Sequence, residues 1–245
     1  MFQQKPIIFY DIPHSVQGSP WSPNTLKTRY TLGYKGIPFT TTWVEYPDIE
    51  PLLKSKGAKP TQVNGLTVYT LPVIEDPSTG AVISDSYDIA LYLDKTYPDT
   101  PKVIPDGTQA LIEAFHSGIL TAFKDTILLS SVIGCAKLNP PSQEYYKRTR
   151  VERYNKKWED FSPPEARPEQ WKEMRRAWNA VDGWYQKSSG TFIMGDKPCF
   201  ADFIVGGRIK WAKVSYSDND WNEMAKWNGG RWEKLLKDLD PYLKD

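Results

Sequence analysis

The sequence predicts two domains of different class, an α/β domain followed by an all-α domain. Up to residue 97, short runs of β-branched and aromatic residues alternate with helical patterns, whereas from residue 108 onward apolar residues recur at spacings of three and four. The segment between them, YPDTPKVIPDG, holds three prolines and little periodicity, as is typical of a linker. We therefore expect domains at residues 1–97 and 108–245, joined by a linker at residues 98–107.

The composition is that of an ordinary globular protein. Of the 245 residues, 40% are hydrophobic and 25% charged, and the formal net charge of +1 gives no reason to expect nucleic acid or an acidic membrane as a partner. No apolar run reaches the roughly 18 residues of a membrane span, and the start MFQQKPIIFYDI lacks a secretory signal core. Two cysteines, Cys135 and Cys199, are too few for a disulfide scaffold. A cytoplasmic location is expected.

The first elements are a strand and a helix with clear ends. Residues 7–10, IIFY, form a short apolar run with strand character. After a loop broken by Pro and Gly, a helix is predicted over residues 24–36 because apolar residues recur every four positions. We expect Ser22 as its N-cap, Pro23 at the first helical position and Gly36 at its end.

The rest of this half predicts a strand, a helix, a hairpin and a final helix. Residues 39–44 are rich in Thr and aromatics and favour a strand, residues 48–56 favour a short helix, and the segment up to Thr67 is expected to be a loop. β-Branched pairs flank the turn-rich segment 76–80, which indicates a hairpin. Strand, helix, strand, helix, hairpin, helix is the thioredoxin-like pattern, with a parallel first pair of strands and an antiparallel second pair.

Two short motifs in this half have chemical consequences. Pro72 begins the first strand of the hairpin, where it cannot donate a hydrogen bond to a neighbouring strand. We therefore expect it at a sheet edge or in a turn, and the Leu71–Pro72 peptide bond can be cis. Asp85 and Ser86 precede the apolar face of the last helix and are typical of a helix start. Backbone N–H groups there, with a hydroxyl beside them, would hold a small anion such as a carboxylate.

The order of Leu71-Pro72-Val73-Ile74, a hairpin, Asp85-Ser86 and Ile89-Ala90-x-Tyr92-Leu93 resembles the glutathione-binding half of glutathione transferases. The resemblance implies that Pro72 is cis, that the backbone of Leu71 pairs with the cysteinyl part of glutathione, and that Asp85 and Ser86 grip the γ-glutamyl end. It also implies a polar residue near the glycine carboxylate, a role that falls on Lys59. The alternatives are that Lys59 is a solvated loop lysine and Asp85 an ordinary helix-start charge.

Ser22 is the candidate for activating glutathione. Ser22-Pro23-Asn24-Thr25-Leu26-Lys27 resembles the Cys-Pro-x-x-x-Arg/Lys helix start of several transferase classes, with Ser in place of Cys. The continuation through Gly36 most resembles the bacterial β-etherases and the etherase-like fungal class, fungal A. A hydroxyl aimed at the glutathione sulfur at a helix N-terminus stabilises the thiolate, which is the nucleophile. Ser19 is a rival because it also precedes a proline, and the plain alternative for Ser22 is a helix cap.

The type of residue at this position decides the type of reaction. A Cys would form a mixed disulfide and favour thiol exchange, whereas Ser can only donate a hydrogen bond to the sulfur. We therefore expect attack of glutathione thiolate on aromatic electrophiles or aryl ethers. The resemblance to the fungal class implies detoxification of plant-derived phenolics, and the resemblance to the family implies a homodimer.

The second half is predicted to be a helical bundle. Apolar residues step by four from Leu111 toward Val132, which predicts one long helix, and further helices are expected over residues 143–161 and 169–187. Beyond them, Cys199 and Asp202 resemble the family's capping box at a buried helix start, with Cys199 in place of the usual hydroxyl. A thiol is a weaker acceptor, so this cap is expected to contribute less than the usual ~1 kcal/mol.

The second substrate is expected between the domains, over Ser22. Taken singly, each candidate residue is more commonly part of a core, but as a set they favour a hydrophobic aromatic small molecule. The candidate linings are Trp21 and one face of the long helix, together with a late aromatic group: Trp21, Phe115, Ile119, Phe123, Trp211, Tyr216 and Trp221.

No other group of residues in the sequence indicates a metal site or a different catalytic mechanism. His14 and His116 are the only histidines, too few and too far apart to indicate a zinc site or a His-based triad, so no metal is expected. The basic run at residues 147–157 is typical of a solvated helix face. Two other functions stay open: a carrier of aromatic ligands with little turnover, and a non-enzymatic interaction module. Against the module, the three glutathione motifs are all present.

Overall fold

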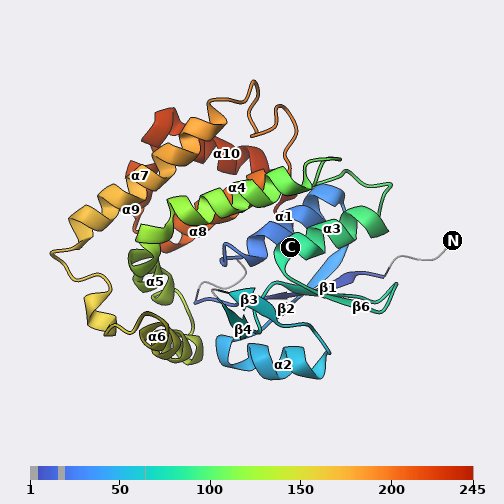
Figure 1. Ribbon diagram of the computed structural model, residues 1–245, viewed down its shortest axis with the longest axis horizontal. Helices are drawn as coiled ribbons and strands as arrows, with labels where there is room; N and C mark the ends of the chain where they lie inside the picture. Colours follow the sequence, from blue (N-terminus) through green and yellow to red (C-terminus); the bar gives the residue numbers. More distant parts are fainter. Residues whose placement is uncertain (1–4, 16–19, 64, 245) are drawn as a thin grey trace.

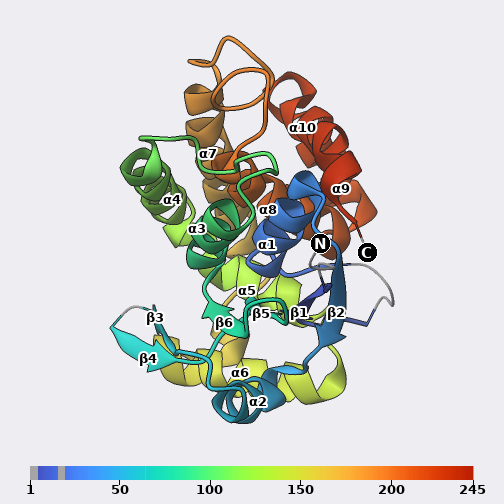
Figure 2. The same ribbon diagram turned by 90° about the vertical axis from the view of Figure 1, so that its right-hand side faces the viewer.

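The computed structural model describes residues 5–15, 20–63 and 65–244 of the chain. These residues form a thioredoxin-like domain followed by a helical domain, so the predicted fold class is confirmed (Figure 1). The helical domain lies over one side of the thioredoxin-like domain, and its α5 and α6 reach down beside the sheet (Figure 2).

The central sheet has the strand order β2-β1-β5-β6. Strand β1 (Ile7–Asp11) pairs parallel with β2 (Phe39–Trp43) and antiparallel with β5 (Val73–Asp76), which pairs antiparallel with β6 (Ala81–Ser84). The predicted hairpin, the parallel first pair and the antiparallel second pair are therefore confirmed. The two central strands, β1 and β5, are almost entirely buried, whereas the edge strands β2 and β6 are partly exposed. Helices lie on both faces of the sheet (Figure 1).

Helices α1 (Thr25–Lys35) and α3 (Ser86–Thr96) lie on one face of the sheet, and α2 (Ile49–Ser55) lies on the opposite face (Figures 1 and 2). Helix α1 ends at Gly36, as predicted, because φ of +67° there suits a residue without Cβ.

One element of this domain was not predicted. Strands β3 (Thr61–Val63) and β4 (Leu66–Val68) form a small antiparallel hairpin where a loop was expected. Each strand has only three residues, and Gln62, Leu66 and Thr67 are exposed, so neither strand carries the alternating apolar pattern of a longer one.

The helical domain contains seven α-helices within the described residues: α4 (Gln109–Ala122), α5 (Ile127–Cys135), α6 (Pro140–Tyr154), α7 (Arg167–Tyr185), α8 (Phe200–Ser215), α9 (Asp218–Ala225) and α10 (Arg231–Leu239). Short 3₁₀ helices occur in both domains: Tyr46–Asp48, Lys124–Thr126, Trp158–Asp160, Trp227–Gly230 and Asp240–Tyr242. The predicted helix over residues 169–187 corresponds to α7.

Two helix predictions in this domain were wrong. The single long helix from Leu111 is broken after Ala122, with a bend of 45°. Phe123 turns into the core against Trp178, and the hydroxyl of Thr126 donates to the carbonyl of Phe123 at 2.8 Å. The second helix, α6, begins at Pro140 rather than at residue 143, because proline suits the first helical turn, and it ends at Tyr154.

Close packing joins the domains. Helix α8 lies against α1, where a Cβ on Gly207 would stand 2.7 Å from the carbonyl oxygen of Pro23. On α3, the Asp94 carboxylate accepts hydrogen bonds from the backbone N–H groups of Val103 and Ile104 and pairs with Lys35 at 2.7 Å. The segment between α3 and α4 is thus held by buried polar contacts.

Among the described residues, no single helix is long and apolar enough to cross a membrane, and α4 with the segment 124–135 passes that test only as a bent pair.

Candidate functional site

The register of the sheet gathers the predicted motifs at one end of it. Tyr10, near the end of β1, faces Val73 at the start of β5, and Val73 faces Ser84 at the end of β6. The loop toward α1 therefore leaves β1, the Leu71–Pro72 bond enters β5, and the start of α3 follows β6, all at the same end of the sheet. Tyr10 and Ser84, which are 74 positions apart in the sequence, are brought to one end of the sheet in this way.

The Leu71–Pro72 peptide bond is cis. Leu71 is buried in an apolar cluster that also holds Tyr10 and Trp21, so its position beside the start of α1 is fixed by packing. Within the described part of the chain, its backbone N–H and C=O have no hydrogen-bond partner. These two groups are available to pair with the backbone of a peptide-like ligand.

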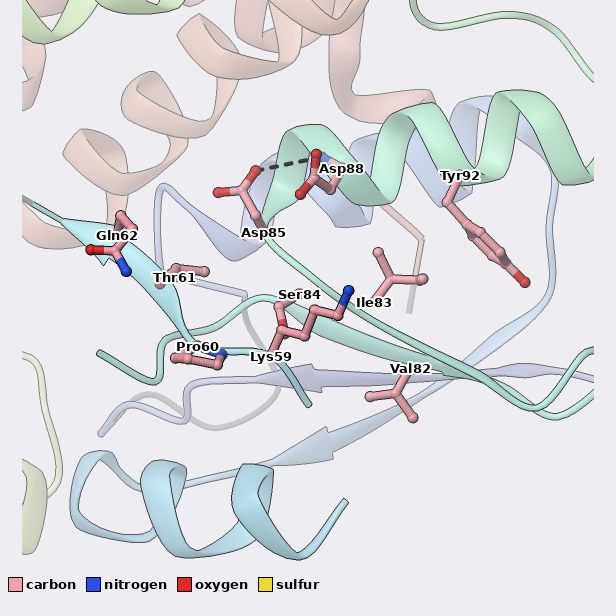
Figure 3. A pocket seen from close by; sticks show the side chains of 10 residues that line it. All are labelled: Lys59, Pro60, Thr61, Gln62, Val82, Ile83, Ser84, Asp85, Asp88 and Tyr92. Atoms are coloured by element: carbon pink, nitrogen blue, oxygen red, sulfur yellow. Dashed lines mark hydrogen bonds between the residues drawn. The ribbon is translucent and has the colours of Figure 1, made fainter. Parts of the chain in front are cut away.

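Asp85 is both a helix cap and an open carboxylate. Its Oδ1 accepts hydrogen bonds from the N–H groups of Tyr87 at 2.7 Å and Asp88 at 3.5 Å, the second of which is drawn in Figure 3. Its Oδ2 accepts none from the described residues, and the side chain is exposed. The backbone of Asp85 has φ of +74°, an uncommon conformation that occurs at ligand clamps. Ser86, the first residue of α3, is buried.

A pocket of about 490 Å³ lies between the β3–β4 hairpin, β6 and α3 (Figure 3). Burial and the nearby Asp85 raise the pKa of Asp88, while the ammonium of Lys59 lowers it. The pocket thus presents a lysine on one side and two carboxylates on the other, so it can meet both charges of a zwitterion. Its lining residues are Lys59, Pro60, Thr61, Gln62, Val82, Ile83, Ser84, Asp85, Asp88 and Tyr92.

Ser22 has a hydroxyl proton that no described residue accepts. The residue is only 3% exposed, and its Oγ accepts long hydrogen bonds from the N–H groups of Asn24 at 3.4 Å and Thr25 at 3.5 Å. The N-cap of α1 is Asn24 rather than Ser22, which corrects the prediction, although the Ser22 carbonyl already accepts the first helical bond, from Leu26 at 3.0 Å. The hydroxyl can therefore donate to an atom of a ligand.

The predicted substrate-lining residues lie in different surroundings. Trp21 is buried, and its indole N–H donates to Ser215 on α8 at 2.9 Å. Phe115 is half-buried with its ring edge-on to Trp184, whereas Ile119 is part of the helical core. Their contact with a second substrate stays a prediction.

The late aromatic residues also join the helical core. Trp211 and Tyr216 pack edge-to-face with ring centroids 5.6 Å apart, and Trp221 is buried. The rival serine, Ser19, lies outside the described residues. In the part of the chain that the structure describes, no three His, Cys, Asp or Glu side chains form a group that could hold a metal ion.

Sequence reasoning missed a group of three residues with ionisable side chains between the domains. Burial lowers the pKa of Lys27 on α1 to about 8, and the nearby Arg208 on α8 acts in the same direction. Burial also lowers the pKa of His116 on α4 to about 4, and the charge of Lys27 contributes. Lys27 entered the sequence comparison only as part of a motif, and no local pattern marks the other two.

Comparison with known families and proteins identifies the chain. Residues 21–96 match the model of the glutathione S-transferase N-terminal domain, and residues 110–242 match that of its C-terminal domain. The glutathione S-transferase-like protein ustS of Aspergillus flavus is 33% identical over 95% of this chain and 89% of its own.

Two solved structures of fungal enzymes are also similar over almost their whole length. A glutathione S-transferase of Ceriporiopsis subvermispora in complex with glutathione has a TM-score of 0.92 and 42% identity, covering 98% of this chain and 99% of that one. Glutathione transferase GSTFuA3 from Phanerochaete chrysosporium has a TM-score of 0.88 and 36% identity, covering 98% of each chain. The chain belongs to the glutathione S-transferase family.

Proposed function

From this membership we propose that the protein is a serine-type glutathione transferase of the etherase-like fungal class. Its co-substrate is glutathione. In the proposal, Ser22 stabilises the glutathione thiolate, which attacks hydrophobic aromatic electrophiles or aryl ethers, and the protein acts as a cytoplasmic homodimer in the detoxification of plant-derived phenolics. The similarity to GSTFuA3 supports the class, and the similarity to a transferase solved with glutathione supports the ligand.

The observation that carries the proposal is the free hydroxyl proton of Ser22. Among the described residues, the hydrogen bonds of its Oγ are two long ones that it accepts, so the hydroxyl can donate to a sulfur without losing a contact. At 3% exposure, a sulfur beside it would be shielded from water, where a hydrogen bond to an anion is strongest. Lowering a thiol pKa by about two units requires roughly 2.7 kcal/mol, which one charge-assisted hydrogen bond and a helix N-terminus can supply.

The remaining motif residues fit the two ends of glutathione. The open Oδ2 of Asp85 can accept from the γ-glutamyl ammonium, and the N-terminus of α3 at Ser86 can hold its carboxylate. The backbone of Leu71, set by the cis Pro72, can pair with the cysteinyl unit. Lys59, across the pocket, can meet the glycine carboxylate. With the peptide held in this way, its sulfur is directed to the start of α1.

The reaction that follows is a substitution. The thiolate sulfur forms a bond to the electrophilic carbon, and the leaving group departs with the electron pair of the bond that breaks, as halide or, from an aryl ether, as an alkoxide or phenolate that then takes a proton. Ser22 forms no covalent bond with glutathione because a hydroxyl cannot enter disulfide exchange.

The test is the pH dependence of the thiolate absorbance of bound glutathione, for the wild type and for Ser22→Ala, with Ser55→Ala as a matched serine control on α2. We expect the wild type and the control to lower the thiol pKa, and Ser22→Ala to lose that effect while still binding glutathione. If all three proteins bind glutathione without lowering the pKa, a carrier of aromatic ligands replaces the enzyme as the function.

A further inference from the structure

Three side chains that can carry positive charge meet between the two domains. Lys27 comes from α1, His116 from α4 and Arg208 from α8, and we call them the interdomain cation cluster. Helix α8 packs against both α1 and α4, so it brings residues of the three helices together (Figures 1 and 2). Lys27 is only 5% exposed, yet within the described chain its ammonium has neither a hydrogen bond nor an ion pair.

The packing of α8 on α1 fixes the cluster. Gly207 touches the carbonyl of Pro23, so the next residue, Arg208, lies beside the first turns of α1. A Cβ on Gly207 would also stand 3.4 Å from the Cβ of Leu26, and Lys27 is the next residue on α1. The guanidinium of Arg208 stacks over the ring of Phe123 at 4.5 Å and, among the described residues, has no carboxylate partner. The packing thus holds the ring of Phe123 and the two cationic side chains close to one another.

The charges around the cluster do not neutralise it. The carboxylates of Asp85 and Glu113 raise the pKa of Lys27, but burial outweighs them and lowers it to about 8. His116, with a pKa of about 4, is neutral at physiological pH. Asp85 directs Oδ1 to the start of α3, and Glu113 is exposed on α4. A buried cation without a partner is costly, so the absence of one among the described residues needs an explanation.

We propose that the interdomain cation cluster binds an anionic group, a carboxylate or a phenolate, on the aromatic second substrate. This inference rests on the proposed function and narrows its substrate class to acidic aromatics. Lys27 and Arg208 bind the anion as cations, neutral His116 can donate one hydrogen bond to it, and the ring of Phe123 lies beside the aromatic part. The anionic group takes no part in the bond changes at the electrophilic carbon.

The placement of the cluster favours the second substrate over glutathione. Two of its three residues, His116 and Arg208, belong to the helical domain. The charged ends of glutathione are already matched by Asp85, the start of α3 and Lys59. We therefore expect Lys27 and Arg208, at the domain boundary, to bind an anion other than glutathione.

The kinetic test compares two electrophiles that differ by one charge, 4-chloro-3-nitrobenzoate and its methyl ester. In both, the glutathione thiolate forms the C–S bond and chloride leaves from the same ring carbon. The variants are Lys27→Met and Arg208→Met, with Lys124→Met as an exposed control that removes the same charge. Methionine at the buried site preserves the packing, because replacing a buried charge by an apolar side chain of similar size is commonly neutral or stabilising.

We expect kcat/KM for the benzoate to fall about 30-fold or more in Lys27→Met, and kcat/KM for the ester to change less than about twofold. Arg208→Met should show the same selectivity, and Lys124→Met should change neither value. An equal loss with both electrophiles, or a loss confined to the KM for glutathione, would overturn the proposal, because the cluster would then serve folding or the glutathione site.

A binding measurement separates failure of this proposal from failure of the proposed function. Titration calorimetry of 3-nitrobenzoate and methyl 3-nitrobenzoate, with the protein saturated by S-methylglutathione, requires no turnover. Tighter binding of the acid than of the ester, lost in Lys27→Met, supports the cluster even if neither electrophile reacts. Equal binding of acid and ester to the wild type refutes it, whatever the activity.

Discussion

Helices α1 and α8 lie against each other, yet their N-terminal ends are built in opposite ways. At α8 the carboxylate of Asp202 accepts hydrogen bonds from the backbone N–H of Cys199 at 3.0 Å, the N–H of Ile193 at 2.9 Å and the hydroxyl of Tyr185 at 2.9 Å. This start is a complete capping box, as predicted, and it is buried. All of its polar groups are matched within the chain.

The start of α1 is left incomplete. Ser22 accepts two long hydrogen bonds and donates none to the described residues, and Lys27, one turn into the helix, has no counter-ion there. The start of α3 lies between these extremes, since one oxygen of Asp85 caps the helix and the other is open. Helix starts have unpaired donors by construction, so what distinguishes a binding site from a structural element is whether the chain itself satisfies them.

The largest effect on stability is expected from removing the capping box at the start of α8. Asp202→Ala removes the acceptor of three hydrogen bonds in the interior of the domain and is expected to lower the free energy of unfolding by about 3–5 kcal/mol. Urea unfolding measures this loss, with Asp202→Asn as the matched variant that keeps part of the acceptor capacity. A loss below about 1 kcal/mol in Asp202→Ala would show that the capping box is not a main structural contact.

Ser22→Cys should change the reaction while leaving stability almost unchanged. The introduced thiolate can attack a glutathionylated disulfide, form a mixed disulfide with glutathione and release the other thiol, after which a second glutathione resolves it. Exchange activity is expected to be at least about 100-fold above the wild type, which has no nucleophilic thiol at this position. A folded variant that gained no exchange activity would place Ser22 away from the sulfur.

Asp85→Asn separates the two roles of Asp85 at the start of α3, capping the helix and binding the ammonium of glutathione. Asn caps helices as well as Asp and tolerates the φ of +74°, so the free energy of unfolding should change by less than about 0.5 kcal/mol. The loss of negative charge opposite a ligand ammonium should weaken glutathione binding about tenfold by calorimetry. If neither glutathione binding nor stability changed, the negative charge of Asp85 would have no role in binding, and the residue would serve only as a helix cap.

The open start of α1 also predicts a pH dependence. With a pKa of about 8, Lys27 is a cation below pH 8 and loses its charge as the pH rises through that value. The ratio of kcat/KM for 4-chloro-3-nitrobenzoate to that for its ester should therefore fall several-fold above pH 8, and the ratio cancels the titration of the shared nucleophile. In Lys27→Met the ratio should be low and flat. A ratio in the wild type that does not change between pH 7 and pH 9.5 would argue against a charged contact.

The smallest effect is expected from strengthening the capping box at the start of α8. Cys199→Ser restores a stronger acceptor and is expected to raise the free energy of unfolding by about 0.5–1 kcal/mol. Thermal and urea unfolding should agree on the sign. Destabilisation would mean that the buried thiol fills its site better than a hydroxyl does.

Local sequence was sufficient for elements whose ends carry their own signals. The end of α1 at Gly36 and the capping box from Cys199 to Asp202 depend on contacts within a few residues, so they could be predicted. The same holds for the hairpin and for the start of α3 at Asp85. The candidate glutathione-site residues were recognised through the resemblance of their motifs to those of glutathione transferases.

Only the tertiary structure decided what distant residues do together. The break after Ala122 depends on Phe123 turning into a core built by α7, and no pattern inside the apolar repeat reveals that. The interdomain cation cluster joins Lys27 and Arg208, which are 181 positions apart, and they meet because Gly207 lets α8 touch α1. The sequence determined which helix starts could bind a ligand, and packing decided which of them stayed unsatisfied, because satisfying a buried donor depends on partners that only the fold brings into reach.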